Sequence, residues 1–307
     1  MRIKKILVPV DFSEYAESAL KYALFWAEAF SAELTLLHVN TLFHEHFDYD
    51  MLIERYREEI DQQERYIRKW MREQDLHVAR SKVKLDFEVL RSRSAAGSIL
   101  DFIPEGGYDL VVMGTHGRTG ARHLFLGSVA EKVARLSPVP VFTTHKEIEV
   151  HGIRRILVPV DFSNFSKTLV ASALEIGQAF DAQVHLLHVL ERLTVTSFRW
   201  MSENAWPYFK MDEDLRSRVT GMLRELPENP DDSRLVYEVV KAPHAYEAVV
   251  DYAGTQEVDL IIMGTRGFSK FDYFWLWGST AERVLRLATC PVLTERVGVE
   301  ETALQEA

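Results

Sequence analysis

The feature of this sequence that most constrains its fold is an internal duplication. Residues 3–39 read IKKILVPVDFSEYAESALKYALFWAEAFSAELTLLHV, and residues 153–189 read IRRILVPVDFSNFSKTLVASALEIGQAFDAQVHLLHV, at a constant offset of 150. Self-similarity at a fixed offset indicates a repeated structural unit. About 150 residues are enough for an independent domain. We therefore expect two tandem domains, residues 1–146 and 152–298.

Within each copy, short apolar runs alternate with stretches of helical periodicity. Ser13 precedes such a stretch and is predicted to cap its helix. Strands that alternate with helices predict a parallel sheet with right-handed crossovers. The predicted fold class is α/β, with two tandem doubly wound five-stranded parallel sheets of strand order 3-2-1-4-5. The first copy is expected to have strands near 6–10, 34–39, 83–90, 108–113 and 139–143 and a short helix at 98–102, and the second copy strands near 154–160, 183–189, 234–240, 258–263 and 291–295.

A glycine-punctuated loop follows the fourth expected strand. Gly114 to Ser128 reads GTHGRTGARHLFLGS. Glycines allow unusual backbone conformations and a close approach of ligands, and the N–H groups at a helix start favour an anion. The loop is either a phosphate cradle or a turn that needs glycine for its geometry, and spacing alone favours neither. In the order 3-2-1-4-5, strands one and four are neighbours where the winding reverses, so Asp11 and this loop face one crevice, which favours the phosphate cradle.

Composition limits the class of partner. The formal net charge is −10 and the pI about 5.6, which argues against a general nucleic-acid binder, since that would need a basic face. The single cysteine, Cys290, rules out an internal disulfide and indicates a reducing compartment. There is no secretory signal pattern and no apolar run long enough to span a bilayer. We expect a cytoplasmic protein without a membrane span.

Three motifs in this sequence resemble those of a known protein family. They are VPVDFS at the end of the first strand, LLHV in the second, and Gly114 and Gly117 followed after nine residues by Gly127-Ser128. Together they resemble the universal stress protein family, and the resemblance covers nearly the whole chain twice. It implies a tandem universal stress protein with domains of the adenine nucleotide alpha hydrolase-like fold, whose first copy has the family's full ATP-binding pattern.

The resemblance also implies which residues hold the nucleotide. The end of the first strand and the end of the second would hold adenine and ribose, through Pro9, Val10, Asp11 and Val39. The glycine loop and the start of the following helix would line the phosphate path, through Met113, Gly114, His116, Gly117, Arg118, Gly127, Ser128 and Val129. A carboxylate accepts hydrogen bonds from ribose hydroxyls, and a serine donates to phosphate. The implied ligand is ATP, ADP or AMP, with Mg²⁺ or Mn²⁺ accompanying the phosphates.

The second copy departs from this pattern in its loop. Ten residues, FSKFDYFWLW, separate Gly267 from Gly278, where the first copy has nine. The corresponding binding residues are Asp161, Val189, Gly264, Gly267, Gly278 and Ser279. The aromatic residues of this loop and of residues 198–209 either pack together and close the site, which we favour, or form an apolar surface for a ligand or partner.

The functional expectation is a non-catalytic, adenine-nucleotide-binding protein that acts as a switch in the stress response, with binding mainly in the first domain. We find no Walker-type phosphate loop, no catalytic constellation and no protein metal site, so slow ATP hydrolysis is the most that the residues suggest. The alternative is a nucleotide-independent interaction or assembly protein, with an apolar-ligand site in the second domain. The last strands of the two copies would pair within an intramolecular pseudo-dimer, and a homodimer of the chain is a further expectation.

Overall fold

The computed structural model describes residues 2–41, 65, 69–70, 72–73, 83–116, 126–145, 152–191, 213–265 and 279–296. The chain divides into two compact units, residues 2–150 and 151–307. We call them the first and the second unit. None of the helices among the described residues is long and apolar enough to cross a lipid bilayer.

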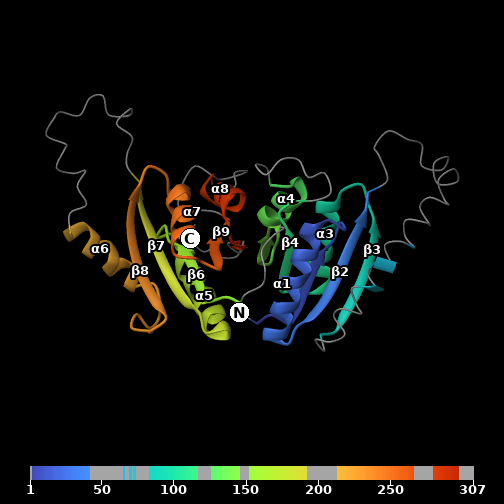
Figure 1. Ribbon diagram of the computed structural model, residues 1–307, viewed down its shortest axis with the longest axis horizontal. Coiled ribbons are helices and arrows are strands. Elements are labelled where there is room, and N and C mark those ends of the chain that lie inside the picture. The colour runs from blue at the N-terminus through green and yellow to red at the C-terminus, as the bar shows by residue number, and fades with distance from the viewer. Residues whose placement is uncertain are drawn as a thin grey trace, which may run out of the picture. The chain divides into compact units, whose positions relative to one another are not determined.

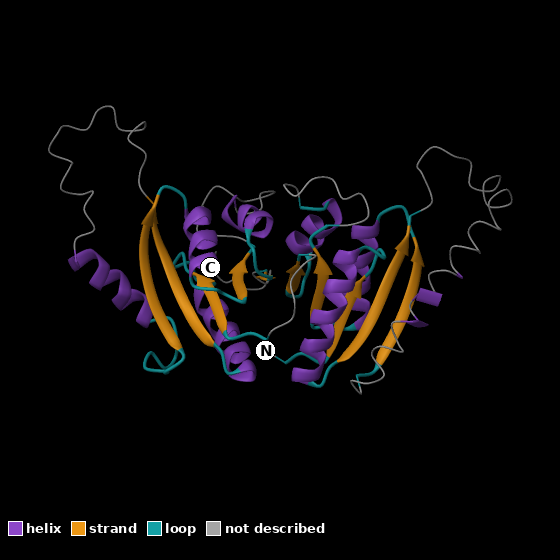
Figure 2. Cartoon of the chain, in the orientation of Figure 1, coloured by secondary structure: helices purple, strands orange, loops and turns teal. Residues whose placement is uncertain are grey.

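The first unit has the predicted sheet (Figures 1 and 2). Its strands lie in the order β3-β2-β1-β4-β5 and all pairs are parallel. In chain order its elements are β1 (Lys5–Pro9), α1 (Glu14–Phe30), β2 (Glu33–Asn40), β3 (Leu85–Arg91), α3 (Ala95–Gly106), β4 (Leu110–Gly114), α4 (Ser128–Leu136) and β5 (Val141–Thr144).

The second unit repeats this topology as β8-β7-β6-β9-β10, again with parallel pairs. The fold class predicted from the sequence is therefore confirmed, including the strand order. The elements are β6 (Arg155–Pro159), α5 (Ser166–Phe180), β7 (Gln183–Glu191), α6 (Glu213–Arg224), β8 (Leu235–Ala242), α7 (Ala245–Thr255), β9 (Leu260–Gly264), α8 (Ser279–Leu287) and β10 (Val292–Glu295).

The core of each unit lies between sheet and helices. In the first unit the β1 residues Ile6, Leu7 and Val8 are fully buried, and so are Ala19 and Ala23 of α1. Alanines have little volume, so they let α1 approach the sheet closely. Because right-handed crossovers place helices on both faces of a doubly wound sheet, α1 lies on one face and α3 and α4 pack together on the other.

One helix is longer than the sequence pattern indicated. The pattern predicted a short helix at residues 98–102, but α3 runs from Ala95 to Gly106. The Ser94 side chain accepts a hydrogen bond from the amide of Gly97 and starts the helix early. Pro104 lies close enough to its C-terminal end to be accommodated, and Gly107 then ends it in the left-handed conformation (φ 64°).

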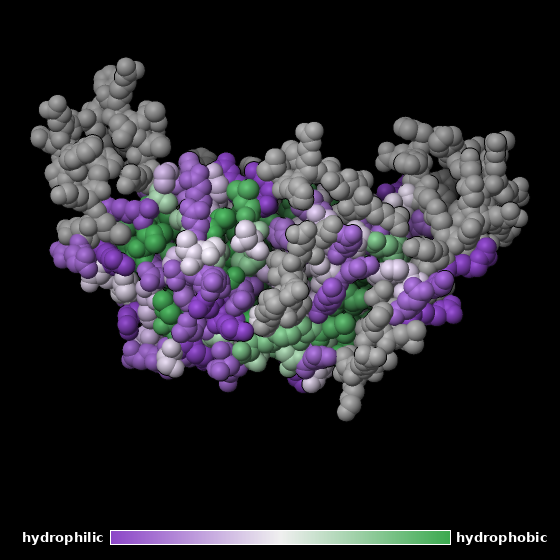
Figure 3. All heavy atoms as spheres, viewed as in Figure 1, coloured by the Kyte–Doolittle hydropathy of each residue, from purple (hydrophilic) through white to green (hydrophobic). Residues whose placement is uncertain are grey.

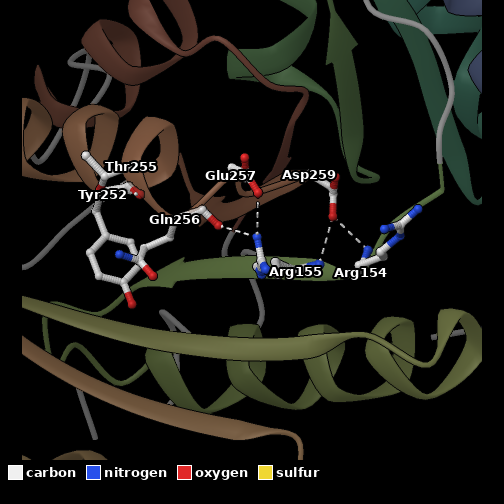
Figure 4. Close-up of polar contacts among 7 residues, drawn as sticks. All are labelled: Arg154, Arg155, Tyr252, Thr255, Gln256, Glu257 and Asp259. Carbon is white, nitrogen blue, oxygen red and sulfur yellow. Dashed lines mark hydrogen bonds and ion pairs between the residues drawn. The ribbon is translucent and has the colours of Figure 1, made fainter.

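An aspartate joins the first and fourth strands of each unit at their amino ends. In the second unit, Asp259 Oδ2 accepts from the amides of Arg154 (2.8 Å) and Arg155 (2.9 Å), and the Arg155 guanidinium donates to the carbonyl of Gln256 (2.8 Å; Figure 4). In the first unit, Asp109 Oδ2 accepts likewise from the amides of Lys4 (2.7 Å) and Lys5 (3.0 Å). This clamp lies at the end of the sheet opposite the predicted site.

Candidate functional site

The predicted site lies where the winding of the first sheet reverses. Strand β1 pairs with β2 on one side and with β4 on the other, through Ile6↔Leu110 and Leu7↔Val111. Because β1 and β4 are parallel neighbours, the residues that follow them emerge at the same edge of the sheet. Asp11 and Gly114 are therefore carried by adjacent strand ends.

The turn after β1 fixes the Asp11 carboxylate. Its Oδ1 atom accepts from the Ser13 hydroxyl (2.6 Å) and from the Ser13 amide (3.1 Å). The Ser13 hydroxyl in turn accepts from the amide of Ala16 (3.2 Å), so the predicted N-cap of α1 is confirmed. Asp11 is thus oriented by the first turn of the helix that follows it.

Contacts among three aromatic rings support this turn. The carbonyl oxygen of Val10 lies 2.7 Å from Nδ1 of His38 on β2. Since a carbonyl can only accept, Nδ1 is the protonated nitrogen of that imidazole. Phe12 has a left-handed backbone (φ 66°), and its ring lies 4.6 Å from that of His38 and 4.9 Å from that of Trp70. Phe12 is therefore held between two rings beside Asp11.

The second unit keeps the same turn. Asp161 Oδ1 accepts from the amide of Ser163 (3.0 Å) and the hydroxyl of Ser166 (3.1 Å). Phe162 has φ 59°, and its ring lies 4.6 Å from His188, whose Nδ1 is 2.7 Å from the carbonyl of Val160. This corner of the site is therefore built alike in both units.

Gly114 is required for a reason that the sequence did not show. A Cβ at this position would lie 2.6 Å from Cβ of Tyr15 and 2.9 Å from its carbonyl carbon and oxygen. Real side chains do not tolerate such distances, so α1 lies close to the end of β4 because residue 114 is glycine. The expectation that Gly114 adopts an unusual backbone conformation was wrong: among the described glycines, those with positive φ are Gly107 and Gly152.

The start of α4 is tied to the end of β4. The Thr115 amide donates to the carbonyl of Thr144 (2.9 Å), and the Gly127 amide donates to the carbonyl of Thr115 (2.8 Å). Gly127 is the N-cap of α4 and, being glycine, has no side chain with which to cap the helix, and Ser128 is exposed. A helix start without a side-chain cap presents N–H groups and the positive end of the helix dipole.

Two histidines lie near this helix start. Thr115 Oγ1 is 3.0 Å from His116 Nδ1, and the His116 ring packs 5.1 Å from that of Tyr15. His145 directly follows β5. Burial, aided by the charge of His116, lowers the pKa of His145 to about 4. His145 was missed from the sequence, because its nearness to His116 depends on the pairing of β4 with β5.

The predicted residues fall into three groups. Val10, Val39 and Met113 are buried, which leaves their main chain for contact with a ligand. The remaining described residues of the first unit lie at the edge or at the start of α4, namely Pro9, Asp11, Gly114, His116, Gly127, Ser128 and Val129. In the second unit Asp161, Val189 and Gly264 are described and Ser279 begins α8. Outside the described residues lie Gly117, Arg118, Gly267, Gly278 and the aromatic residues of 198–209 and 268–277.

The second unit differs from the first at this edge of the sheet, because it has two carboxyl groups there. Glu295 pairs with Gly264 in the sheet, at the register position that Thr144 has opposite Gly114. Its side chain is buried and accepts from the Ser172 hydroxyl (3.2 Å), and burial raises its pKa to about 7. The Glu191 carboxylate accepts from the amide of Ala245 (2.6 Å) at the start of α7. The first unit has Ser94 as the corresponding cap.

These observations define a class: a tandem pair of doubly wound α/β domains, each with an aspartate turn at the end of its first strand. The sequence model of the universal stress protein family matches residues 2–145 and 152–296. The chain belongs to the universal stress protein family and contains its domain twice.

Individual relatives agree with this assignment. A universal stress protein of Methanocaldococcus jannaschii is 30% identical over 148 residues, which are 47% of this chain and 82% of the relative. The universal stress protein YxiE of Bacillus subtilis is 30% identical over 150 residues, 45% of this chain and 95% of the relative. The crystal structure of a universal stress protein from Archaeoglobus fulgidus has the same fold, with a TM-score of 0.67 and 21% identity over 96% of this chain and 99% of that one.

Proposed function

We propose that the first unit binds ATP or another adenine nucleotide, and that the protein acts as a non-catalytic switch in the stress response. The observation that carries the proposal is that two features lie at the same edge of the first sheet, one after β1 and one tied to the end of β4 by the Gly127 amide. One is the fixed carboxylate of Asp11. The other is the α4 start at Gly127, which has no side-chain cap.

The two features suit the two halves of a nucleotide. A carboxylate held by a turn accepts hydrogen bonds from the hydroxyls of a ribose. A helix start without a side-chain cap binds a phosphate through its N–H groups and its dipole. Gly127 and Ser128 would hold the phosphates, and Asp11 would hold the ribose. Mg²⁺ or Mn²⁺ would be carried by the phosphates.

Binding is proposed mainly for the first unit. The second unit keeps the Asp161 turn, so its nucleoside corner is similar. However, ten residues separate Gly267 from Gly278 where the first unit has nine, and this change in the loop that would hold the phosphates supports the preference. We further propose residues 1–146 and 152–298 as the two domains, a cytoplasmic location, and hydrolysis that is at most slow.

Calorimetric titration of ATP, ADP and AMP into nucleotide-stripped protein tests the proposal. We expect one site per chain, with affinity that rises with the number of phosphates. Asp11→Asn should weaken binding at least about tenfold, because a hydrogen-bonded charged acceptor contributes about 1.5–3 kcal/mol. The matched control is Asp161→Asn, the same change in the same turn of the second unit, which should leave binding unaltered. Two equal sites, or equal effects of the two variants, would contradict the preference for the first unit.

A second candidate function is assembly without a nucleotide. The large exposed hydrophobic side chains among the described residues are Leu215 (40%), Met222 (46%) and Leu287 (38%), and all three belong to the second unit. Figure 3 shows hydrophilic and apolar residues mixed on the face that it draws. Leu215 and Met222 are seven residues apart on α6 and therefore lie on one face of that helix, which is the observation that favours this candidate. This candidate predicts a homodimer that sediments alike with and without ATP and dissociates when the three residues are changed to serine.

A further inference from the structure

A pair of imidazoles occupies the phosphate end of the first unit. His116 follows β4 and His145 follows β5, the strands paired through Gly114↔Thr144. His116 is held by the Thr115 hydroxyl (3.0 Å) and by the Tyr15 ring (5.1 Å). Nδ1 of His145 is buried without a hydrogen-bond partner among the described residues. The two rings are close enough for the charge of one to lower the pKa of the other.

The second unit has a permanent cation at each corresponding position. The duplication aligns His116 with Arg266. The registers Gly114↔Thr144 and Gly264↔Glu295 align His145 with Arg296. An arginine is always charged, whereas a histidine gains its charge only on protonation. Both copies therefore place basic residues at these two positions, but only the first copy has residues that titrate there.

Other groups surround this pair. The elements packed against β4 and β5 are α1 and α4. Burial and the charge of His116 are the two causes that set the pKa of His145. The titratable and charged side chains at the near end of α1 and along α4 are Glu14, Tyr15, Glu17, Glu131, Lys132 and Arg135.

We propose that His116 and His145 form a proton-linked part of the nucleotide site, so that the first unit takes up protons when it binds a phosphate-bearing ligand. The inference rests on the proposed function, because it needs an anion at the start of α4. It adds His145 to the site and makes affinity depend on pH. An uncharged nucleoside should bind without this coupling.

The direction of the effect follows from linkage. In the free protein both burial and the neighbouring imidazole disfavour the charged form of His145. In a medium of effective dielectric about 20, one negative phosphate charge at about 6 Å would raise such a pKa by about two units. The pKa of His145 in the complex would then lie near 6, above the value of about 4 in the free protein. Affinity for ATP should therefore rise as the pH falls through the bound pKa, and should level off below the free pKa.

The test is calorimetry of ATP binding in buffers of different ionisation enthalpy, with adenosine as the uncharged ligand. Near pH 6.5 we expect uptake of about a quarter of a proton with ATP and none with adenosine. Affinity for ATP should be about twofold tighter near pH 6 than near pH 7.5. Phosphate itself titrates near pH 6. The proton uptake due to the histidines is therefore measured as the difference between wild type and the double variant His116→Gln/His145→Gln. The exposed His244→Gln in the second unit is the matched control and should behave as wild type.

The outcomes separate the two proposals. Uptake that disappears in the double variant but persists in His244→Gln supports the inference. Equal uptake in wild type and double variant overturns it and leaves nucleotide binding intact. If neither ATP nor adenosine binds at any pH, the proposed function fails and the inference falls with it. A nitrogen-15 NMR titration of the wild type does not depend on a variant: the pKa of His145 must rise on addition of ATP, and an unchanged value overturns the inference.

Discussion

Tyr15 and Gly114 meet at the carboxyl end of the first sheet, where a Cβ on Gly114 would lie 2.9 Å from the Tyr15 carbonyl carbon. The obstacle includes main chain, so it cannot be relieved by a rotamer change. The start of α1, which orients Asp11, can therefore lie this close to β4 only because Gly114 has no side chain.

We predict that Gly114→Ala destabilises the first unit by about 1–3 kcal/mol, the usual cost of overpacking. The control is Gly221→Ala in α6, where an added Cβ meets nothing within 4 Å. Relief of the glycine entropy cost should stabilise that variant by about 0.5–1 kcal/mol. Urea unfolding followed by circular dichroism measures both. Equal stability of Gly114→Ala and wild type would contradict the close approach of α1.

A second prediction concerns Glu295 and pH. Burial raises the pKa of this carboxyl group from 4.5 to about 7 in the folded protein. The folded state thus holds its proton more tightly than the unfolded state does. The associated stability is fully present below the unfolded pKa and is lost as the pH rises through about 7, in total roughly 3 kcal/mol.

Glu295→Gln removes the titrating group and should flatten this pH dependence in the second unit. Urea unfolding of wild type and variant between about pH 5 and pH 8 measures it. The control is Glu225→Gln, since Glu225 is exposed. A wild-type stability that rises over this interval, with no difference from Glu295→Gln, would show that the carboxyl group is not buried as described.

A third prediction concerns the clamp drawn in Figure 4. Asp259→Ala removes the acceptor for two main-chain amides, those of Arg154 and Arg155. We expect a loss of about 1–3 kcal/mol from the second unit. Glu257→Ala breaks only the ion pair with Arg155, at 3.3 Å and with the glutamate side chain 85% exposed. It should change stability by no more than about 1 kcal/mol. Thermal or urea unfolding measures the stability of both variants. Equal losses of stability would contradict the role given to Asp259.

A fourth prediction concerns the reactivity of Cys290. The thiol is buried, and burial raises its pKa to about 12. Only the thiolate is a nucleophile, so the native protein should react with a thiol reagent at least about a hundredfold more slowly than the protein in urea. Since the chain has one cysteine, a reagent that releases a coloured group on labelling measures the reaction of Cys290 alone. Rapid stoichiometric labelling of the native state would contradict its burial.

The sequence was sufficient for the architecture because the fold depends on repeated local patterns. Apolar runs of strand length, helical periodicity and the constant offset together predict two parallel sheets with helical crossovers, whereas the strand order is shown by the pairing of the strands. Ser13 could be assigned as a cap because its partner lies three residues along the chain. The turn of Asp11 is likewise local, since its carboxylate accepts from the amide and the hydroxyl of Ser13.

The features that escaped prediction join residues distant in sequence. The hydrogen bond between Ser172 and Glu295 spans 123 residues. The spacing of residues therefore gave no indication of a buried acid. The same holds for Tyr15 beside Gly114 and for His116 near His145. Gly114 matched a ligand-binding motif, but the physical constraint on it here is the packing of a helix.

Phe12 and Phe162 occupy equivalent positions in the two copies and have the same unusual backbone conformation. Each is a bulky residue in the left-handed region, at φ 66° and 59°, a conformation that costs of order 1–3 kcal/mol. Both copies retain this turn although their glycine loops differ in length and composition. Between the two copies of this chain, the aspartate–phenylalanine corner is therefore kept together with its energetic cost, while the loop between the glycines changes in length and composition.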